Sequence, residues 1–345
     1  REVFEDGSVL IRFVTENGTI ISEGLVYDNI ELYDFSYLDG NDNLLNTFGD
    51  DYLETTICVP NELGGCLPTS VCYNSSNNKY YFYGGRRIII VDGDTNEILD
   101  TINISETGNI GSDSHIEILT VQRRLVYNPI ENKIYCITDE GKLVEIDGNT
   151  NDINVIYQIQ DPQKFVYGNL HYNQNTNKVF CVINEFDIYE GWNGVIKEYD
   201  CNNQVFSCQI EYPILIKDIT TTHVGNKVYI SFSDGVKILD ASDLSLIAEH
   251  NDIHAGAMVY NSNANELYVA CGNKIAVIDG ITNELLPNIN VSSGNNLIEY
   301  NPVNNKIYCS SGGYVRIIDR VSGHQIAEYN IPHAMSLLYT VSYTH

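Results

Sequence analysis

The feature that most constrains this chain is a ten-residue segment that occurs twice. Residues 127–136 read YNPIENKIYC and residues 300–309 read YNPVNNKIYC. Internal repetition at intervals of a few tens of residues is typical of a fold built from repeated structural units. Related segments begin at Tyr73, Tyr172 and Tyr260, and a shortened copy covers residues 223–229.

Each copy predicts two strands joined by a tight turn. An aromatic residue recurs eight positions after the first Tyr of each full copy, with a polar, Asn-rich stretch between them. Asn, Pro, Ser and Gly favour the backbone conformations of a chain reversal, and the flanking residues are β-formers. Farther along each copy, a β-branched run closes on an acidic residue, at Asp34, Asp92, Asp147, Asp200, Asp240, Asp279 and Asp319.

A second turn follows several of these runs. Residues 92–96 read DGDTN and residues 279–283 read DGITN, and such stretches predict a hairpin turn whose left-handed residue is Gly or Asn. A fourth strand, such as residues 326–331, would complete an antiparallel unit of four strands.

The spacing of the units predicts their arrangement. The seven Asp residues lie 58, 55, 53, 40, 39 and 40 positions apart, which suits the blades of a propeller, whose apolar faces are buried only by stacking around a centre. The sequence therefore predicts an all-β, seven-bladed β-propeller of four-stranded antiparallel blades, as one domain over residues 1–345. Blade 1 is expected at about 8–50 and blades 2–7 at about 66–335.

Closure of the ring has two interpretations. Residues 336–339 resemble the inner strand at 297–300. Either the C-terminal segment at 336–343 completes blade 1 as a clasp, or it begins an eighth repeat. The clasp is favoured because an open ring would leave a sheet edge exposed.

The pattern YNPxxNKIY followed by VIDGxTN resembles the YVTN-repeat family of β-propellers, over essentially 66–335 and more loosely 8–50. The chain departs from the four name-giving letters, since it has YCIT at 135–138, YVAC at 268–271 and YCSS at 308–311. The resemblance implies a surface-layer or secreted propeller of the kind found in archaea and bacteria, mostly without assigned catalysis.

The charge excludes two classes of partner. Lys and Arg number 19 against 46 Asp and Glu, a net charge of −27, which repels nucleic-acid phosphates and anionic lipid headgroups. We therefore expect no nucleic-acid partner. No apolar run approaches the roughly 18 residues of a membrane span, so no membrane insertion is expected, and residues 1–20 lack the apolar core of a signal peptide.

Three connections are longer than the turns of the repeat, at 105–117, 158–169 and 184–194, and residues 58–69 add a fourth. They are expected on the face opposite the short turns, and insertions of this kind often carry binding. Residues 184–194 (NEFDIYEGWNG) hold the only Trp of the chain. The candidate binding residues on this long-loop face are Trp192, Tyr189, Phe186, Asp187, Glu190, Phe165, Tyr167 and His115.

The aromatic and acidic residues of 184–194 support two interpretations. Aromatic faces beside carboxylates suit sugar rings, and Tyr, Trp and Phe also dominate protein interfaces. Alternatively, the aromatic side chains fold onto their own blade as a cap.

The nine cysteines suggest packing and not chemistry. Cys136, Cys181 and Cys309 occupy one repeat position, which predicts a small buried hydrophobic residue. Cys201 and Cys208 flank a turn, and Cys58, Cys66 and Cys72 cluster near a loop. One or two disulfides would be able to form in an exported chain.

We expect no metal and no cofactor. Residues 92–96 imitate the start of a calcium loop, but Ile281 stands at the middle ligand position of the equivalent segment, which favours a plain turn. His171 and His223 begin inner strands and would face the channel, where hydrogen-bonded core is the expected role.

The sequence favours a non-catalytic binding or assembly module of a cell surface, secreted structure or virion exterior. Its long-loop face would contact a protein or a glycan. The alternative is an enzyme at the channel mouth, of lactonase or glycan hydrolase or lyase type, that would use carboxylates together with His171 or His223. No catalytic residue is assigned, because no Ser–His–Asp or phosphate-loop motif is present.

Overall fold

The structure is a computed structural model, and its described part is all-β. The predicted fold class is confirmed at this level. None of the described residues forms a helix that is long and apolar enough to cross a membrane. The described residues are 9–14, 20–27, 30–34, 53–58, 70–84, 87–104, 123–138, 141–158, 165–187, 189, 191–222, 225–295, 297–302, 304–311, 314–330 and 334–338.

Six antiparallel sheets follow one another between residues 70 and 330, and five of them have four strands. In the remaining one, β22 takes the place of two strands, because its first half pairs with β21 and its second half with β23. Gly272, at φ 66°, lies between the halves. The strands are β5 (Ser70–Asn74), β6 (Lys79–Gly84), β7 (Arg87–Asp92) and β8 (Ile98–Asn103); β9 (Leu125–Asn128), β10 (Lys133–Ile137), β11 (Lys142–Asp147) and β12 (Ile153–Gln158); β13 (Phe165–Asn173), β14 (Lys178–Asp187), β15 (Gly191–Asp200) and β16 (Val205–Tyr212); β17 (Asp218–Thr221), β18 (Lys227–Ser231), β19 (Val236–Asp240) and β20 (Leu246–His250); β21 (Met258–Asn261), β22 (Glu266–Asp279) and β23 (Leu285–Asn295); β24 (Leu297–Asn301), β25 (Lys306–Ser311), β26 (Tyr314–Asp319) and β27 (His324–Asn330).

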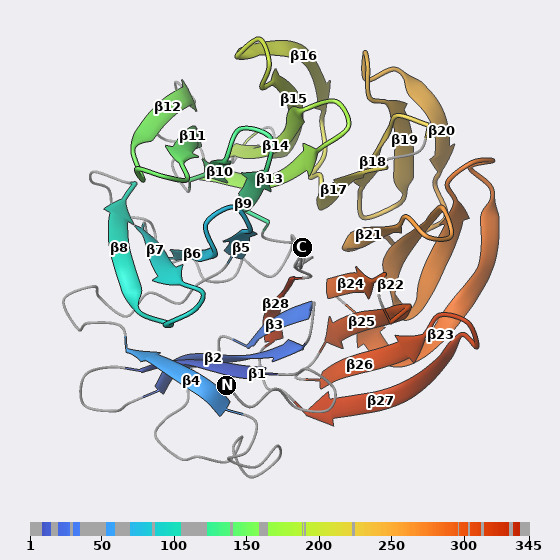
Figure 1. Ribbon diagram of the computed structural model, residues 1–345. Coiled ribbons are helices and arrows are strands. Elements are labelled where there is room, and N and C mark those ends of the chain that lie inside the picture. The colour runs from blue at the N-terminus through green and yellow to red at the C-terminus, as the bar shows by residue number, and fades with distance from the viewer. Residues whose placement is uncertain are drawn as a thin grey trace.

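The sheets are arranged around a common centre, with the first strand of each sheet nearest to it (Figure 1). These first strands contact one another in chain order, from β5 to β9, β13, β17, β21 and β24. Apolar clusters fill the space between successive sheets; one cluster, for example, joins Ile90 of β7 to Ile146 of β11. The aromatic residue predicted eight positions after each Tyr is almost completely buried, at Tyr81, Tyr135, Phe180, Tyr268 and Tyr308.

A seventh sheet joins the two ends of the described chain. Its order is β28-β3-β2-β1-β4, where β28 is antiparallel to β3 and β4 is parallel to β1. The order of this sheet differs from that of the four-stranded sheets. The strand that ends on Asp34, β3, pairs directly with β28 and is the second strand of its sheet, whereas in the four-stranded sheets the strand that ends on Asp is the third one counted from the centre. The strand β4 was not expected from the sequence. The bounds are β1 (Val9–Val14), β2 (Ile20–Tyr27), β3 (Ile30–Asp34), β4 (Leu53–Cys58) and β28 (Ala334–Leu338).

The repeat residues shape the turns. Asparagine takes the left-handed conformation in both turns, for example Asn132 at φ 54° in the first turn and Asn151 at φ 64° in the second. The expectation that Gly or Asn supplies the positive φ of the second turn is met by Asn, and Gly148 has another role. A Cβ there would lie 2.5 Å from Asn132 Oδ1 and 2.7 Å from its carbonyl oxygen, so the glycine allows the two turns to approach each other.

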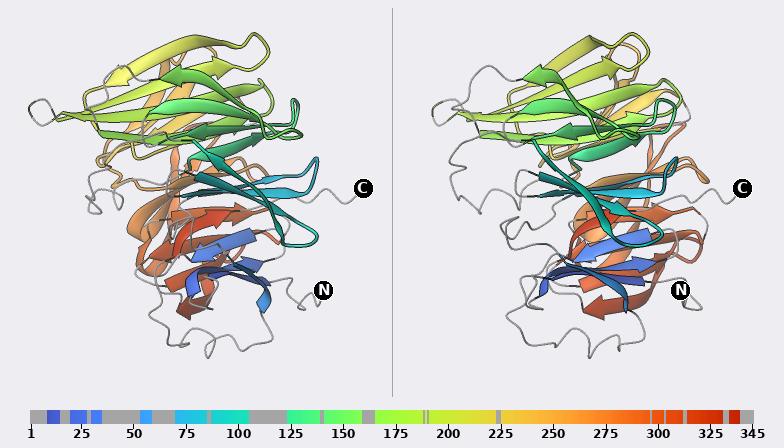
Figure 2. Two further views of the ribbon diagram at one scale, coloured as in Figure 1. Left: turned by 90° about the vertical axis from the view of Figure 1, so that its left-hand side faces the viewer. Right: turned by 60° about the vertical axis from the view of Figure 1, so that its left-hand side comes forward.

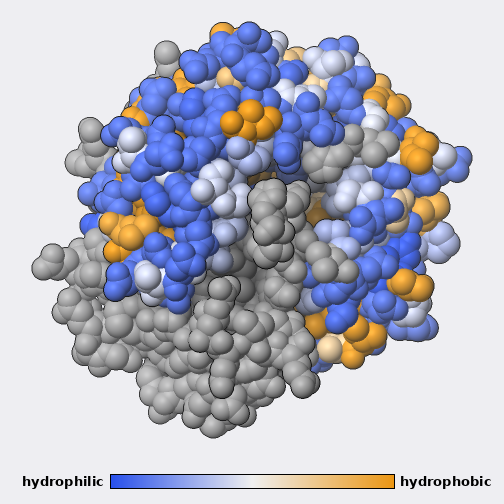
Figure 3. Space-filling model, viewed as in Figure 1, coloured by the Kyte–Doolittle hydropathy of each residue, from blue (hydrophilic) through white to orange (hydrophobic). Residues whose placement is uncertain are grey.

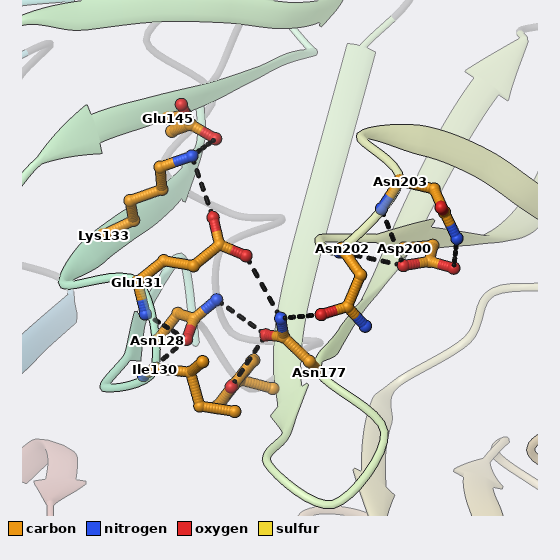
Figure 4. Close-up of polar contacts among 10 residues, drawn as sticks. Asn128, Ile130, Glu131, Lys133, Glu145, Asn177, Asp200, Asn202 and Asn203 are labelled. Carbon is orange, nitrogen blue, oxygen red and sulfur yellow. Dashed lines mark hydrogen bonds and ion pairs between the residues drawn. The ribbon is translucent and has the colours of Figure 1, made fainter.

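A network of asparagine side chains joins neighbouring sheets at these turns (Figure 4). Asn128 Nδ2 donates to Asn177 Oδ1 at 2.9 Å, and Asn177 Nδ2 donates to Glu131 Oε1 at 3.1 Å and to Asn202 Oδ1 at 2.8 Å. One sheet earlier, Asn74 Nδ2 donates to Asn132 Oδ1 at 2.8 Å. The Asn residues of the repeat therefore specify both the turn and the contact with the next sheet.

Candidate functional site

The strands β14 and β15 form an extended hairpin of ten residues each, against five in the equivalent strands β18 and β19. The expectation of a loop over 184–194 was wrong, because β14 continues to Asp187 and β15 resumes at Gly191. The end of the connection expected at 158–169 is also a strand, since β13 begins at Phe165. The extension projects beyond its neighbours, on the side facing away from the viewer of Figure 1 (Figure 2).

Cross-strand pairing explains why these residues continue the strands. Phe186 pairs with Trp192 and Glu185 with Asn193 in the antiparallel register. Facing aromatic residues stabilise a strand pair by roughly 0.2–1 kcal/mol. Gly191, at φ 83°, accommodates the reversal.

The aromatic side chains near the tip fall into two kinds. The rings of Phe186 and Trp192 lie 4.9 Å apart at an interplanar angle of 50°, and both residues are half-buried. Tyr189, in the turn, is 90% exposed. The hairpin thus carries two aromatic rings that pack against each other, Phe186 and Trp192, and an exposed Tyr189 in the turn.

The other predicted binding residues are placed only in part. Phe165 is the register partner of Phe186, and Tyr167 is the partner of Asn184, so Phe165, Phe186 and Trp192 occupy one row across three strands. Asp187 ends β14 opposite Gly191. Glu190, His115 and the side chains of Phe165, Tyr167 and Asp187 lie outside the described residues.

The base of the hairpin is fixed to the segment that leads to the next sheet. Asn184 Nδ2 donates to the carbonyl of Ile216 at 2.8 Å, and the N–H of Ile216 donates to Asn184 Oδ1 at 2.9 Å. Asn184 is fully buried. Because buried paired amides hold a rigid geometry, the tip is displayed from a firm base.

A second polar cluster, which we call the central triad, consists of Arg123, Asp218 and Glu299. Arg123 precedes β9, Asp218 begins β17 and Glu299 lies in β24. The strands β9, β17 and β24 lie near the centre in Figure 1. Arg123 Nη1 lies 3.4 Å from Asp218 Oδ2, and Arg123 Nη2 lies 3.5 Å from Glu299 Oε2. The side chains are 23%, 0% and 15% exposed, in that order.

Burial perturbs every member of the central triad. It raises the pKa of Asp218, against the opposing effects of Arg123 and of the N–H groups of Met258 and Ile219. It raises the pKa of Glu299 to about 7, although Arg123 acts in the other direction. Burial disfavours the charged form of Arg123 as well, yet the two carboxylates keep its pKa above the ordinary value.

The central triad was not predicted from the sequence. The sequence does contain an indication of it, namely a charged residue in each of two first strands. Asp218 stands in DITT at 218–221 and Glu299 in LIEY at 297–300, and the other residues of these stretches are apolar, Thr or Tyr. Charged residues on strands that line a centre are costly unless paired, and their pairing could not be read from positions 123, 218 and 299.

Several other predictions can be placed. Cys136, Cys181 and Cys309 are almost completely buried, as predicted. Cys201 and Cys208 are thiols and are not joined by a disulfide. His171 lies in β13 and is half-buried, while His223 lies outside the described residues.

The segment at 92–96 is a hairpin turn that uses its own carboxylate. The N–H groups of Asp94 and Thr95 donate to Asp92 Oδ1 at 2.9 and 2.8 Å, and these bonds hold the pKa of Asp92 below its usual value. Within the described ranges, no group of three or more His, Cys, Asp or Glu residues is arranged to hold a metal ion.

Comparison with models of known protein families found no match, and a search of curated proteins found no match either.

Proposed function

We propose that this chain is a seven-bladed β-propeller that binds a partner protein through the projecting β14–β15 hairpin. The observation that carries the proposal is the tip, where a packed Phe186–Trp192 pair flanks the turn that contains Tyr189, which is 90% exposed. Tyr and Trp are the residues most often found at interface hot spots. The resemblance to YVTN-repeat propellers and the net charge of −27 agree with a position on a cell surface, secreted structure or virion exterior.

The seven-bladed arrangement is supported by strand contacts. β28 contacts both β24 and β5, the first strands at either end of the series of six sheets, and it pairs with β3. In this proposal the sheet of β28, β3, β2 and β1 is the seventh blade and β28 is its clasp. An experimental structure with residues 334–338 away from β3 would overturn it.

The shape of the tip favours a protein over a glycan. Small ligands usually occupy concave sites, whereas a projecting strand pair is convex and fits a groove on a partner. On the face seen in Figure 3, exposed apolar side chains of the described residues are scattered among hydrophilic ones. Scattered apolar residues are normal for a surface, so the hairpin on the other side is the stronger candidate.

The test is a peptide-display selection against the whole chain, run in parallel with a glycan array. We expect selected peptides to bind the wild type and to change the fluorescence of Trp192, the only Trp. Tyr189→Ser and Trp192→Ala should each weaken binding by roughly tenfold or more, since hot-spot truncations cost about 2 kcal/mol. Val321→Ser, which alters another exposed residue far along the chain, is the matched control and should bind normally.

Two outcomes would overturn this function. One is peptide binding that both hairpin variants retain, which would place the interface elsewhere. The other is specific glycan binding without any peptide binding, which would make the site a lectin-like one.

The channel-mouth enzyme is the second candidate, and the central triad is the observation that favours it. Two carboxylates with raised pKa values near a centre are typical of acid–base sites. It is the weaker candidate because Arg123 lies against both carboxylates, where a substrate would have to enter. Turnover of lactone or glycan substrates that is lost in Glu299→Gln would support it.

A further inference from the structure

Arg123 connects parts of the molecule that are distant in the sequence. Its guanidinium contacts Asp218 of β17 and Glu299 of β24, and Nη2 donates to the carbonyl of Met258 in β21 at 3.1 Å. Its backbone N–H donates to Asn169 Oδ1 of β13 at 3.0 Å. One residue therefore bridges four sheets besides its own.

The two carboxylates of the central triad are not equivalent. Asp218 accepts hydrogen bonds from the N–H groups of Met258, at 2.7 Å, and of Ile219, at 2.8 Å, in addition to its contact with Arg123. Glu299 has its carboxylate 3.5 Å from Arg123 Nη2, accepts a hydrogen bond from a single backbone N–H group, that of Tyr300, and is 15% exposed against 0% for Asp218. Hydrogen bonds to a carboxylate favour its ionised form, so a proton entering the triad goes to Glu299.

The charge of the triad changes with that proton. With both carboxylates ionised, one guanidinium faces two negative charges, and the triad carries a net charge of −1. With Glu299 protonated, the triad is neutral. An unbalanced charge in a buried place is costly, so the protonated triad is the better fit to the centre of the fold.

The groups around Glu299 do little to balance the charge of the central triad. Among the described residues, the charged groups that act on Glu299 are Arg123 and Asp218. The neighbouring strands place Tyr308 of β25 opposite Glu299 and Met258 of β21 beside Asp218, and the sequence of β28, AMSLL, contains no titratable side chain. Lys217, next to Asp218 in the chain, interacts with Cys271.

We propose that the central triad is a proton-operated lock, in which proton uptake by Glu299 holds the inner strands β9, β17, β21 and β24 together and proton loss loosens them. The direction follows from linkage. Glu299 has a higher pKa in the folded chain, about 7, than in the unfolded chain, where the ordinary value is 4.5. Its contribution to stability is therefore present below pH 4.5 and is lost as the pH rises to about 7.

The experiment is thermal unfolding of the whole chain at pH 5, 6, 7 and 8 for the wild type, Glu299→Gln and Glu284→Gln. Glu284 is exposed, so its variant controls for the loss of one surface charge. We expect the melting temperature of Glu299→Gln to rise relative to the wild type by roughly 5 °C between pH 5 and pH 8. The difference between Glu284→Gln and the wild type should stay constant.

Hydrogen exchange separates a lock from a general effect on stability. Exchange of amides in β17 and β24, corrected for its intrinsic pH dependence, should accelerate in the wild type from pH 6 to pH 8 and stay level in Glu299→Gln. Parallel melting curves for the two Gln variants across the pH range would overturn the lock.

A measurement on the wild type covers the case in which Glu299→Gln does not fold. In the ¹³C-labelled protein, we expect one Glu carboxyl resonance to titrate near neutral pH. If every Glu carboxyl titrates below about pH 5, within the ordinary range for Glu, the proposal fails.

Discussion

The two ends of the β13–β16 sheet differ in how strongly the rest of the molecule constrains them. At one end, Asn177 is 5% exposed and holds Asn128, Glu131 and Asn202 through its side-chain amide. At the other end, Tyr189 is 90% exposed, and a Cβ at Gly191 would meet no atom of the described residues within 4 Å. The first end specifies the fold, and the second end can change without disturbing it.

The comparison with the next sheet supports this division. At the constrained end, Asn226 takes the same left-handed conformation as Asn177, with φ 49° against 51°. At the other end, β18 and β19 stop after five residues, whereas β14 and β15 extend to ten. Variation in length is thus confined to one end, and loops on a rigid scaffold are where binding functions usually develop.

The largest effect is expected from breaking the constrained end at Asn177. Asn177→Ala removes the hydrogen bonds of a buried amide. It also places alanine at a φ of 51°, in the left-handed region that alanine disfavours. We expect the free energy of unfolding to fall by about 3 kcal/mol, measured by urea denaturation. Asn177→Gly keeps the φ angle accessible and loses only the bonds, so it should cost less than Asn177→Ala. Equal costs for the two variants would mean that the backbone conformation contributes nothing.

A smaller effect is expected where two turns approach each other. Gly148→Ala would place a methyl group 2.5 Å from Asn132 Oδ1, and we expect it to lower the free energy of unfolding by about 2 kcal/mol. Gly191→Ala is the control, because it has a positive φ in open space and should cost only about 1 kcal/mol. If Gly191→Ala is the more damaging change, the hairpin end is the more constrained one and the comparison is reversed.

The constrained end was predictable from the sequence because its turns and strand ends consist of residues that recur in every repeat. All seven Asp-ended runs are the ends of strands, and the aromatic residue eight positions after each Tyr is buried. Local chemistry decides both features, since Asn favours the left-handed conformation and β-branched runs favour buried strands.

The variable end and the centre were less predictable for physical reasons. Phe186 and Trp192 are paired across a hairpin, and the polar letters around them suggested a loop because the pairing register is not visible in a local pattern. The central triad joins positions 123, 218 and 299, and such contacts depend on the whole topology. Residues 336–339 resemble the inner strand at 297–300 and so indicated a C-terminal strand, but the order of the sheet of β28, β3, β2 and β1 follows no repeat.

The smallest effect on stability is expected at the hairpin tip, where we expect the largest effect on binding. Tyr189→Ser should change the free energy of unfolding by no more than about 0.5 kcal/mol, because the side chain is 90% exposed. Trp192→Ala should cost about 1 kcal/mol, since it removes one half of a tilted aromatic pair. Urea denaturation of both variants, followed by circular dichroism, measures these costs. If Trp192→Ala instead costs as much as Asn177→Ala, the aromatic pair is a cap that the β13–β16 sheet requires, and a partner-binding role for Trp192 loses its support. If both costs are small, selection for stability alone does not account for an extended, aromatic hairpin, and recognition of a partner becomes the reason for its length.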